Sequence, residues 1–265
     1  MNRTEKIAHK LLENWQAKTP YETLSGDLAP QSLADAYKAQ GALQLLHIPH
    51  RGAVAGRKIA LSSKVMQQMV GLDQPIAGAI FAGDVLNSSA KVAARVARGD
   101  FIRLGLEFEL AIELNADIAP RIAEAAAHTR QSVANYIAAV RPAFELIEDR
   151  AADYQNLDAH TLIADNAWCG GVVLGNVIDG WRDMDLADIA SRVVQSGEAD
   201  EHANTGAADP LGSLAWVLNH FGERGIALSK GEQIITGSAV RTRFPSPGDS
   251  FAYHVAGASV QVEIV

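Results

Sequence analysis

The sequence predicts an α+β fold, with helices in the first fifty residues and strands over most of the rest. Apolar residues recur at helical spacing near the N-terminus, apolar and other side chains alternate without a break over residues 103–114, and the C-terminal part is rich in strand-like runs. Helices and strands do not alternate as in βαβ proteins. We expect one domain over residues 1–265, in which residues 1–50 form a helical N-terminal segment.

The composition is that of an ordinary globular protein of 265 residues, with 48% hydrophobic and 20% charged side chains. A net charge of −8 argues against a nucleic-acid partner, which needs a basic surface. A small anionic substrate stays open, because a bound metal can supply positive charge. Cys169 is the only cysteine, which favours a reducing compartment. Charges throughout residues 1–15 and the lack of a long apolar stretch lead us to expect a cytoplasmic protein without a membrane partner.

The first fifty residues predict two helices. Apolar side chains recur at helical spacing from Ile7 to Trp15, so residues 4–17 are expected to form an amphipathic helix. After a polar loop, residues 32–46 predict a second helix. Ser32 with Asp35 three residues later resembles a capping box at its start.

The next segment contains the clearest strand of the chain. Residues 53–63 form a glycine-interrupted, strand-like run, whereas residues 72–83, with Pro75 and several glycines, indicate a loop. Residues 101–114 predict a strand, because apolar side chains occupy every second position.

The second half of the chain predicts two helices and several strands. Residues 122–140 predict a helix, and Pro142 is expected to start a strand over residues 142–150. Residues 210–225 predict a helix that is closed by Gly222 or Gly225. Strand-like runs follow at residues 233–240 and 246–265, with a turn at Pro247-Gly248-Asp249.

Two carboxylates on the clearest strand could hold a metal ion. Glu107 and Glu109 are two residues apart, so both side chains leave the same face, with Cα atoms about 6.5–7 Å apart. Such carboxylates can reach round one ion, and oxygen ligands with open positions favour Mg²⁺ or Mn²⁺ over zinc. The alternative is that both lie on the solvent face of a half-exposed strand.

The pattern leaves the third ligand and the acid–base group open. Glu145 lies in another expected strand, but Glu148 and Asp149 compete with it. Lys58 lies in an apolar run, and a lysine partly buried beside a metal would have a lowered pKa and could transfer protons. The alternative is a surface lysine of which only the stem is buried.

Six segments, taken in order, resemble a known family: GRKIALSSKVMQQMVGLDQP, LEFELAIEL, PAFELIEDR, IADNAWCGGVVLG, DPLGSLAWVLN and IITGSAV. They are similar to the 2-keto-4-pentenoate hydratase and 2-oxo-hexenedioate (4-oxalocrotonate) decarboxylase family of the fumarylacetoacetate hydrolase superfamily. Several motifs in one order, over residues 30–265, are more specific than any single motif. The resemblance implies a mixed β-roll or distorted barrel with the N-terminal helices packed outside.

The resemblance also implies roles for individual residues. The metal ligands of the family correspond to Glu107, Glu109 and Glu145, and its active-site lysine corresponds to Lys58. Asp73 matches an acidic position on a loop over the site and is expected to share proton transfer with Lys58. The implied cofactor is Mg²⁺ or Mn²⁺ and the implied substrate is a small 2-oxo acid. We also expect a homo-oligomer.

Two positions depart from the family's pattern. Ala60 stands where the lysine motif usually has glycine, and Trp168 stands where a small polar serine is common. We expect Trp168 and Ser238 to contact the substrate. The indole is expected to fill space that a longer or carboxylated substrate tail would use, because burying an unpartnered carboxylate against it is costly.

These expectations favour a metal-dependent hydratase of 2-hydroxypenta-2,4-dienoate-type acids in the catabolism of aromatic compounds. The alternative is a 4-oxalocrotonate decarboxylase, because both reactions share one enolate; Trp168 favours the hydratase by indicating an apolar pocket wall. An acylpyruvate hydrolase is less favoured, since the sequence shows no clear His–Glu dyad. A catalytically silent partner subunit is also less favoured, because such a subunit has no physical need to keep like charges clustered.

Overall fold

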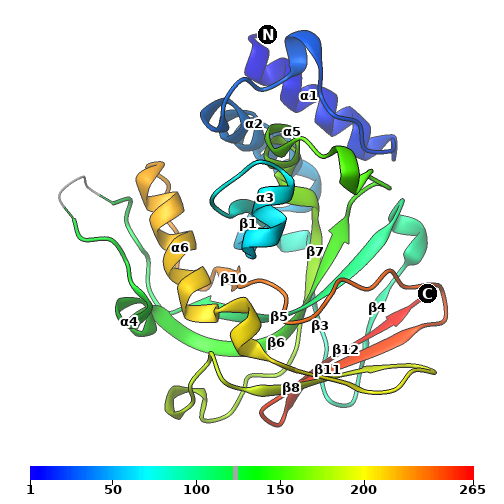
Figure 1. Cartoon of the computed structure of the whole chain (residues 1–265), viewed down its shortest axis with the longest axis vertical. Coiled ribbons are helices and arrows are strands. Elements are labelled where there is room, and N and C mark those ends of the chain that lie inside the picture. The colour runs from blue at the N-terminus through cyan, green and yellow to red at the C-terminus, as the bar shows by residue number, and fades with distance from the viewer. Residues whose placement is uncertain (122–124) are drawn as a thin grey trace.

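Two β-sheets with helices packed outside them make up the computed structural model, which describes residues 1–121 and 125–265 (Figure 1). The seven-stranded sheet has the spatial order β2 (Ile76–Phe81), β1 (Val54–Ala60), β10 (Gln233–Ile235), β5 (Leu104–Leu114), β6 (Ile137–Glu148), β7 (Cys169–Leu174) and β3 (Val85–Asn87). The five-stranded sheet has the order β4 (Ala94–Val96), β12 (Ala258–Ile264), β11 (Ser250–Val255), β8 (Ala190–Gln195) and β9 (Glu201–Asn204). The α-helices are α1 (Arg3–Gln16), α2 (Leu33–Arg51), α3 (Lys64–Met69), α4 (Arg130–Val133), α5 (Ala159–Ala164) and α6 (Pro210–Glu223). The α+β prediction is confirmed.

The N-terminal helices form where the sequence predicts them. α1 begins after Asn2, whose side chain accepts a hydrogen bond from the backbone N–H of Glu5 at 3.0 Å, and the Glu5 carboxylate accepts from Asn2 N–H in return. α2 begins after Ser32, which accepts from Asp35 N–H at 3.2 Å, and it runs beyond its predicted end to Arg51. α1, α2 and α5 pack on one another at the top of Figure 1, so these helices lie outside the sheets as expected.

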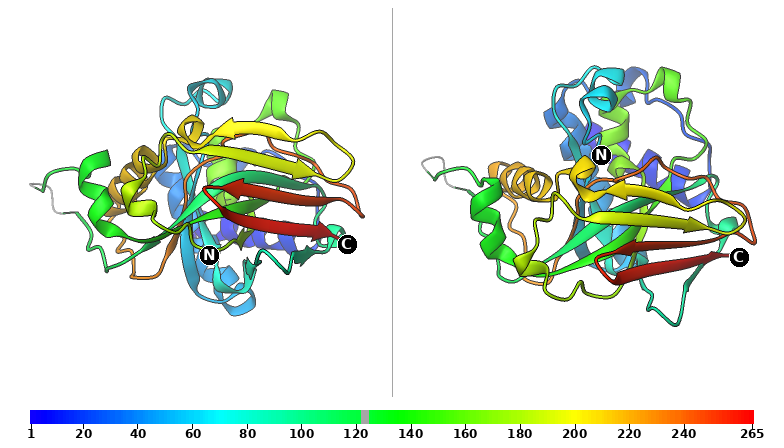
Figure 2. Two further views of the ribbon diagram at one scale, coloured as in Figure 1. Left: turned by 90° about the horizontal axis from the view of Figure 1, so that it is seen from below. Right: turned by 60° about the horizontal axis from the view of Figure 1, so that its bottom comes forward.

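β5 and β6 form the centre of the fold and pair antiparallel along their length. The even-numbered side chains of β5 face the smaller sheet: the ring of Phe108 lies 5.3 Å from that of Phe144 and 5.8 Å from that of Tyr253, between centroids. Figure 2 shows β8, β11 and β12 lying across this strand pair. The odd-numbered side chains of β5 therefore point to the other face of the larger sheet, away from the smaller sheet. Glu107 and Glu109 are among them.

The loop prediction for residues 72–83 is wrong, because Ile76–Phe81 form β2, a strand with every residue buried. A Cβ atom on Gly78 would lie 2.6 Å from the carbonyl oxygen of Asn166, so this glycine allows a close approach between β2 and a neighbouring turn. A strand that is buried on both faces also lacks the alternation by which strands are recognised.

The helix prediction for residues 122–140 is also wrong over its described part; residues 122–124 lie outside the described residues. A single turn of helix, α4, and a 3₁₀ turn lead directly into β6, which begins at Ile137. Pro142, expected to start the strand, lies inside it opposite Leu110 of β5. Pairing with β5 along the whole strand outweighs the helix propensity of its alanines.

The C-terminal helix and hairpin are confirmed, whereas β8 and β9 have no counterpart among the predicted strands. α6 ends at Glu223, and Gly225, with φ at +73°, follows its last turn. β11 and β12 form an antiparallel hairpin, as the C-terminal sequence indicates. Within the described ranges, no helix has the length and apolar character that crossing a membrane requires.

Gly78→Ala is expected to lower the free energy of unfolding by about 1–3 kcal/mol, the usual cost of forcing extra atoms into a packed site. The added methyl group would meet the carbonyl of Asn166. Gly41→Ala in α2 is the matched control, because nothing lies within 4 Å of its added Cβ, and it should leave stability unchanged or raise it. Urea denaturation measures both variants; a Gly78→Ala protein as stable as wild type would refute the close contact.

Candidate metal centre and active site

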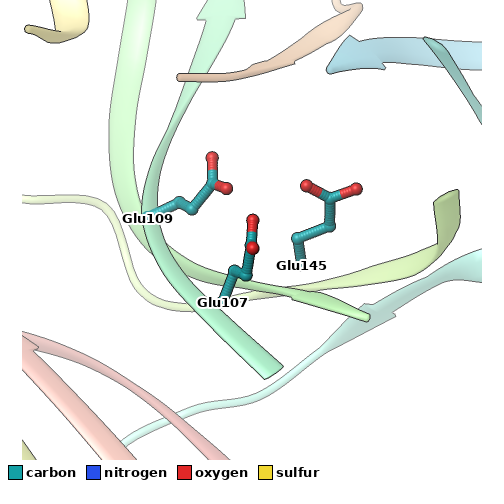
Figure 3. Close-up of side chains that lie close together, drawn as sticks. All are labelled: Glu107, Glu109 and Glu145. Carbon is teal, nitrogen blue, oxygen red and sulfur yellow. The ribbon is translucent and has the colours of Figure 1, made fainter. Parts of the chain in front are cut away.

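Three glutamates from two neighbouring strands converge on one face of the larger sheet. Glu107 and Glu109 come from β5, and Glu145 comes from β6, directly opposite Glu107 in the strand register. One carboxylate oxygen of each lies within 4.8 Å of the other two. Figure 3 shows the three side chains leaving the same side of the strand pair toward a common space. The structure thus brings together the three residues that the family resemblance singles out.

Two of the three carboxylates are fully buried, so they do not lie on a solvent-facing side of the strand. Glu109 is 1% and Glu145 0% exposed. Glu109 Oε2 accepts a hydrogen bond from Gly237 N–H at 2.6 Å, and Glu107 Oε1 accepts one from the Thr242 hydroxyl at 2.7 Å. Glu109 Oε1 and Glu145 Oε2 are buried without a hydrogen-bond donor in the described part of the chain. Such oxygens around one space fit a hard divalent cation, Mg²⁺ or Mn²⁺.

Electrostatics within the cluster favour a bound cation. Burial raises the pKa of Glu109 well above its ordinary value, and the charges of Glu145 and Glu107 raise it further. Burial also raises the pKa of Glu145, to about 7, although the nearby ammonium of Lys58 opposes that shift. The fold must therefore hold protons on these groups or bind a cation, because uncompensated buried charges are costly.

Lys58 on β1 lies against the cluster. Its side chain is 2% exposed, and its Nζ lies 2.9 Å from Glu145 Oε1 and donates to the Ala167 carbonyl at 2.9 Å. Burial lowers the pKa of Lys58, but the negative charge of Glu145 above all outweighs burial and raises the pKa to about 12. The whole side chain is buried, which excludes a surface lysine. A cation held by the carboxylates would cancel the negative charge that keeps this pKa high.

The two carboxylates that compete with Glu145 in the sequence have other partners. Glu148 accepts hydrogen bonds from backbone N–H groups, including that of Ile102 at 2.7 Å. Asp149 pairs with Arg103 at 2.6 Å. Both carboxylates stabilise the end of β6, which leaves Glu145 as the member of this segment that reaches the cluster.

A left-handed turn supplies the carbonyl to which Lys58 donates. Asn166, Ala167 and Trp168 have φ values of 56°, 49° and 58°, a conformation that residues other than glycine seldom adopt in succession. The Asn166 side chain holds the turn by exchanging two hydrogen bonds with the backbone of Ala79 in β2, at 2.8 and 2.9 Å. The sequence gives no local sign of these hydrogen bonds, because Ala79 and Asn166 are distant along the chain.

A cavity of 810 Å³ opens over the cluster. Lys58 and Glu107 lie in its wall, together with Trp168 and Ser238, the residues expected to contact substrate. Asp73 is exposed on the loop before β2 and is not among the residues that line this cavity, so the structure does not bring it to the cluster. The cavity gives an organic acid access to the cluster where Glu107 and Lys58 line it.

Several relatives and solved structures resemble this chain over most of its length, although no protein-family model matches it. The chain is 28% identical over 265 residues to 2-keto-4-pentenoate hydratase from Paraburkholderia xenovorans (strain LB400), covering 98% of this chain and 94% of the relative. It is 30% identical over 199 residues to 2-hydroxypent-2,4-dienoate hydratase from Pseudomonas putida, covering 74% and 85%. The structure of 4-oxalocrotonate decarboxylase from Pseudomonas putida G7, complexed with magnesium and adipate, matches with a TM-score of 0.88 at 21% identity, covering 100% and 99%.

Mg²⁺ is expected to raise the melting temperature, and to raise it more at about pH 8 than at about pH 5.5. Because burial raises the pKa values of Glu109 and Glu145, protonation of these two groups stabilises the metal-free fold. This stabilisation is complete only below about pH 4.3, the ordinary pKa of glutamate. That contribution is lost as the pH rises through about 7, the folded pKa of Glu145, where a cation takes the place of the protons. Thermal melts with and without Mg²⁺ test this, and an equal Mg²⁺ effect at both pH values would contradict it.

Glu145→Ala should affect Mg²⁺ binding, whereas Glu148→Ala should affect the stability of the fold. Glu145→Ala should abolish the response to Mg²⁺, because it removes a member of the cluster. Glu148→Ala should keep Mg²⁺ binding but lower the free energy of unfolding by about 1–3 kcal/mol for each backbone N–H left without an acceptor. Calorimetric titration with Mg²⁺, combined with chemical denaturation, separates the two effects, and the reverse pattern would show that the third ligand is misassigned.

Proposed function

The chain belongs to the 2-keto-4-pentenoate hydratase family, and we propose that it catalyses metal-dependent hydration of a 2-hydroxy-2,4-dienoate. The observation that carries the proposal is the pairing of Lys58 with a cluster of three carboxylates under a cavity that admits an organic acid. A hydro-lyase of this kind needs both parts: a site that holds the oxygens of the acid and a group that moves protons.

The reaction adds water across a double bond after the substrate has changed from its enol to its keto form. The 2-hydroxydienoate takes a proton at C5 and gives up the proton of its 2-hydroxyl group, which leaves a 2-oxo-3-enoate. Water then provides a hydroxyl group at C4 and a proton at C3, which yields a 4-hydroxy-2-oxo acid. Atoms and charges balance without an oxidant, so the protein has to position the acid and transfer protons.

The residues of the cluster divide this work. Glu107, Glu109 and Glu145 would hold a divalent cation, which supplies Lewis acidity toward the carboxylate and 2-oxo oxygens of the substrate. Lys58 carries a proton on Nζ beside Glu145, lies in the cavity wall and is therefore placed to exchange that proton with the substrate. The expected role of Asp73 in proton transfer stays a prediction, and it would require the loop before β2 to approach the cavity.

A 4-oxalocrotonate decarboxylase is the second candidate, because the protein of that name from Pseudomonas putida G7, complexed with adipate, shares this fold. Arg241, which lines the cavity and is exposed, could pair with the second carboxylate of such a substrate. We favour the hydratase, because the buried wall near Ile147, Leu162 and Trp168 is apolar and a carboxylate there would lack a partner.

The assembly of the protein into a homo-oligomer and its location in the cytoplasm stay predictions.

Lys58→Met should retain Mg²⁺ binding but lose turnover of 2-hydroxypenta-2,4-dienoate by about 10²–10⁴-fold, the usual effect of removing one acid–base group. Methionine fills the buried space of the lysine stem but carries no proton. Lys91→Met on an exposed turn is the control and should leave the rate unchanged. Metal affinity and kcat are measured on both variants; a Lys58→Met enzyme that is about as fast as wild type would remove Lys58 from the mechanism.

A further inference from the structure

The cavity extends well beyond the metal cluster. Its volume is 810 Å³, within the range of roughly 300–1,000 Å³ found for sites that hold drug-sized ligands. The acid 2-hydroxypenta-2,4-dienoate has only eight non-hydrogen atoms, which occupy roughly 240 Å³ even at the 30 Å³ that a water molecule takes up in the liquid. Most of the cavity would stay empty around such a substrate.

Trp168 does not fill this space. Its indole packs edge-on against the rings of Tyr21 at 5.1 Å and Tyr154 at 5.7 Å, between centroids, and the residue is 6% exposed. The side chain therefore forms part of a wall and does not act as a plug. The expectation that the indole takes up the room of a longer tail is thus replaced by one in which it provides an apolar surface for that tail.

Further apolar side chains also line the cavity. Met66 and Met69 of α3 border the cavity together with Ile147, Leu157 and Leu162. Ile147, Leu162 and Trp168 belong to one buried cluster, and Leu157 packs against it. Met69 is 43% exposed, which leaves apolar surface that an apolar ligand could cover. Methionine side chains adapt readily to ligands of different shape.

The charged side chains that line the cavity come from other segments of the chain than the apolar side chains named above. Two of them are Lys58 and Glu107 of the metal cluster. Among the described lining residues, the other charged or titratable side chains are Glu201, which pairs with Arg243, the exposed His202 and Arg241, and Tyr154, whose hydroxyl donates to Asp149. A carboxylate placed against the apolar wall would be buried without a cation.

We propose that the substrate carries a bulky, uncharged apolar substituent at C5, such as an aryl or branched alkyl group. This inference rests on the proposed function, because the metal cluster must hold the 2-oxo acid end. The tail then lies between the methionines of α3 and the wall formed by Leu157, Leu162 and Trp168. Burial of the tail provides binding energy that a five-carbon acid does not supply.

Saturated 2-oxo acids test the tail separately from turnover, because they have no double bond to hydrate. Calorimetric titrations of the Mg²⁺-loaded protein would compare 2-oxopentanoate, 2-oxo-5-phenylpentanoate and 2-oxoadipate. The phenyl acid should bind at least about tenfold more tightly than 2-oxopentanoate, and 2-oxoadipate should not bind more tightly than 2-oxopentanoate. Equal affinities of the phenyl and short acids, or a preference for 2-oxoadipate, would overturn the proposal.

Leu157→Arg should reverse this preference, because it places a cation in the apolar wall: affinity for the phenyl acid should fall about tenfold and affinity for 2-oxoadipate should rise. Leu45→Arg, at a position of α2 that is 69% exposed, is the matched control and should leave the order of affinities unchanged. Unchanged preferences in Leu157→Arg, with unchanged Mg²⁺ affinity, would refute the assigned wall. A wild-type protein that prefers the phenyl acid but hydrates no dienoate would refute the proposed hydratase and support the apolar tail site.

Discussion

Three carboxylates that share one space repel one another, and two of them, Glu109 and Glu145, are fully buried. Glu109 and Glu145 have oxygens without donors in the described chain, and burial raises the pKa of both. Lys58 offsets one charge, and the N–H of Gly237 satisfies one oxygen. These contacts leave the cluster short of positive charge, and a divalent cation is the hard, oxygen-seeking partner that would complete it.

The fold meets this constraint by giving the two faces of one strand pair different tasks. The even-numbered side chains of β5 pack against the smaller sheet, with Phe108 and Tyr253 in contact, and this packing fixes the register of β5 on β6. That register places Glu107 opposite Glu145 on the other face. A slip of one residue would send the carboxylates into the apolar core, so the same packing that stabilises the fold also positions the site.

Local patterns predicted what depends on local structure, and failed where distant segments meet. The alternation of side chains in β5 predicts a strand because one face of this strand is apolar throughout. β2 was mistaken for a loop because Gly78 serves a contact with Asn166, which is distant in the chain. Spacing could not separate Glu145 from Glu148; the resemblance chose Glu145, and in the structure only this one reaches the cluster. Tyr21 and Tyr154, which pack against the indole of Trp168, cannot be identified from the residues beside it, so the sequence alone does not show how this ring is held.

The three carboxylates are expected to bind one divalent cation. Crystals of the protein grown with Mn²⁺, measured at a wavelength where manganese scatters anomalously, test it most directly. One strong anomalous peak per chain is expected between Glu107, Glu109 and Glu145, and it should disappear when Mn²⁺ is replaced by Mg²⁺. A map without a peak at this place, or with the principal peak at other side chains, would contradict the account.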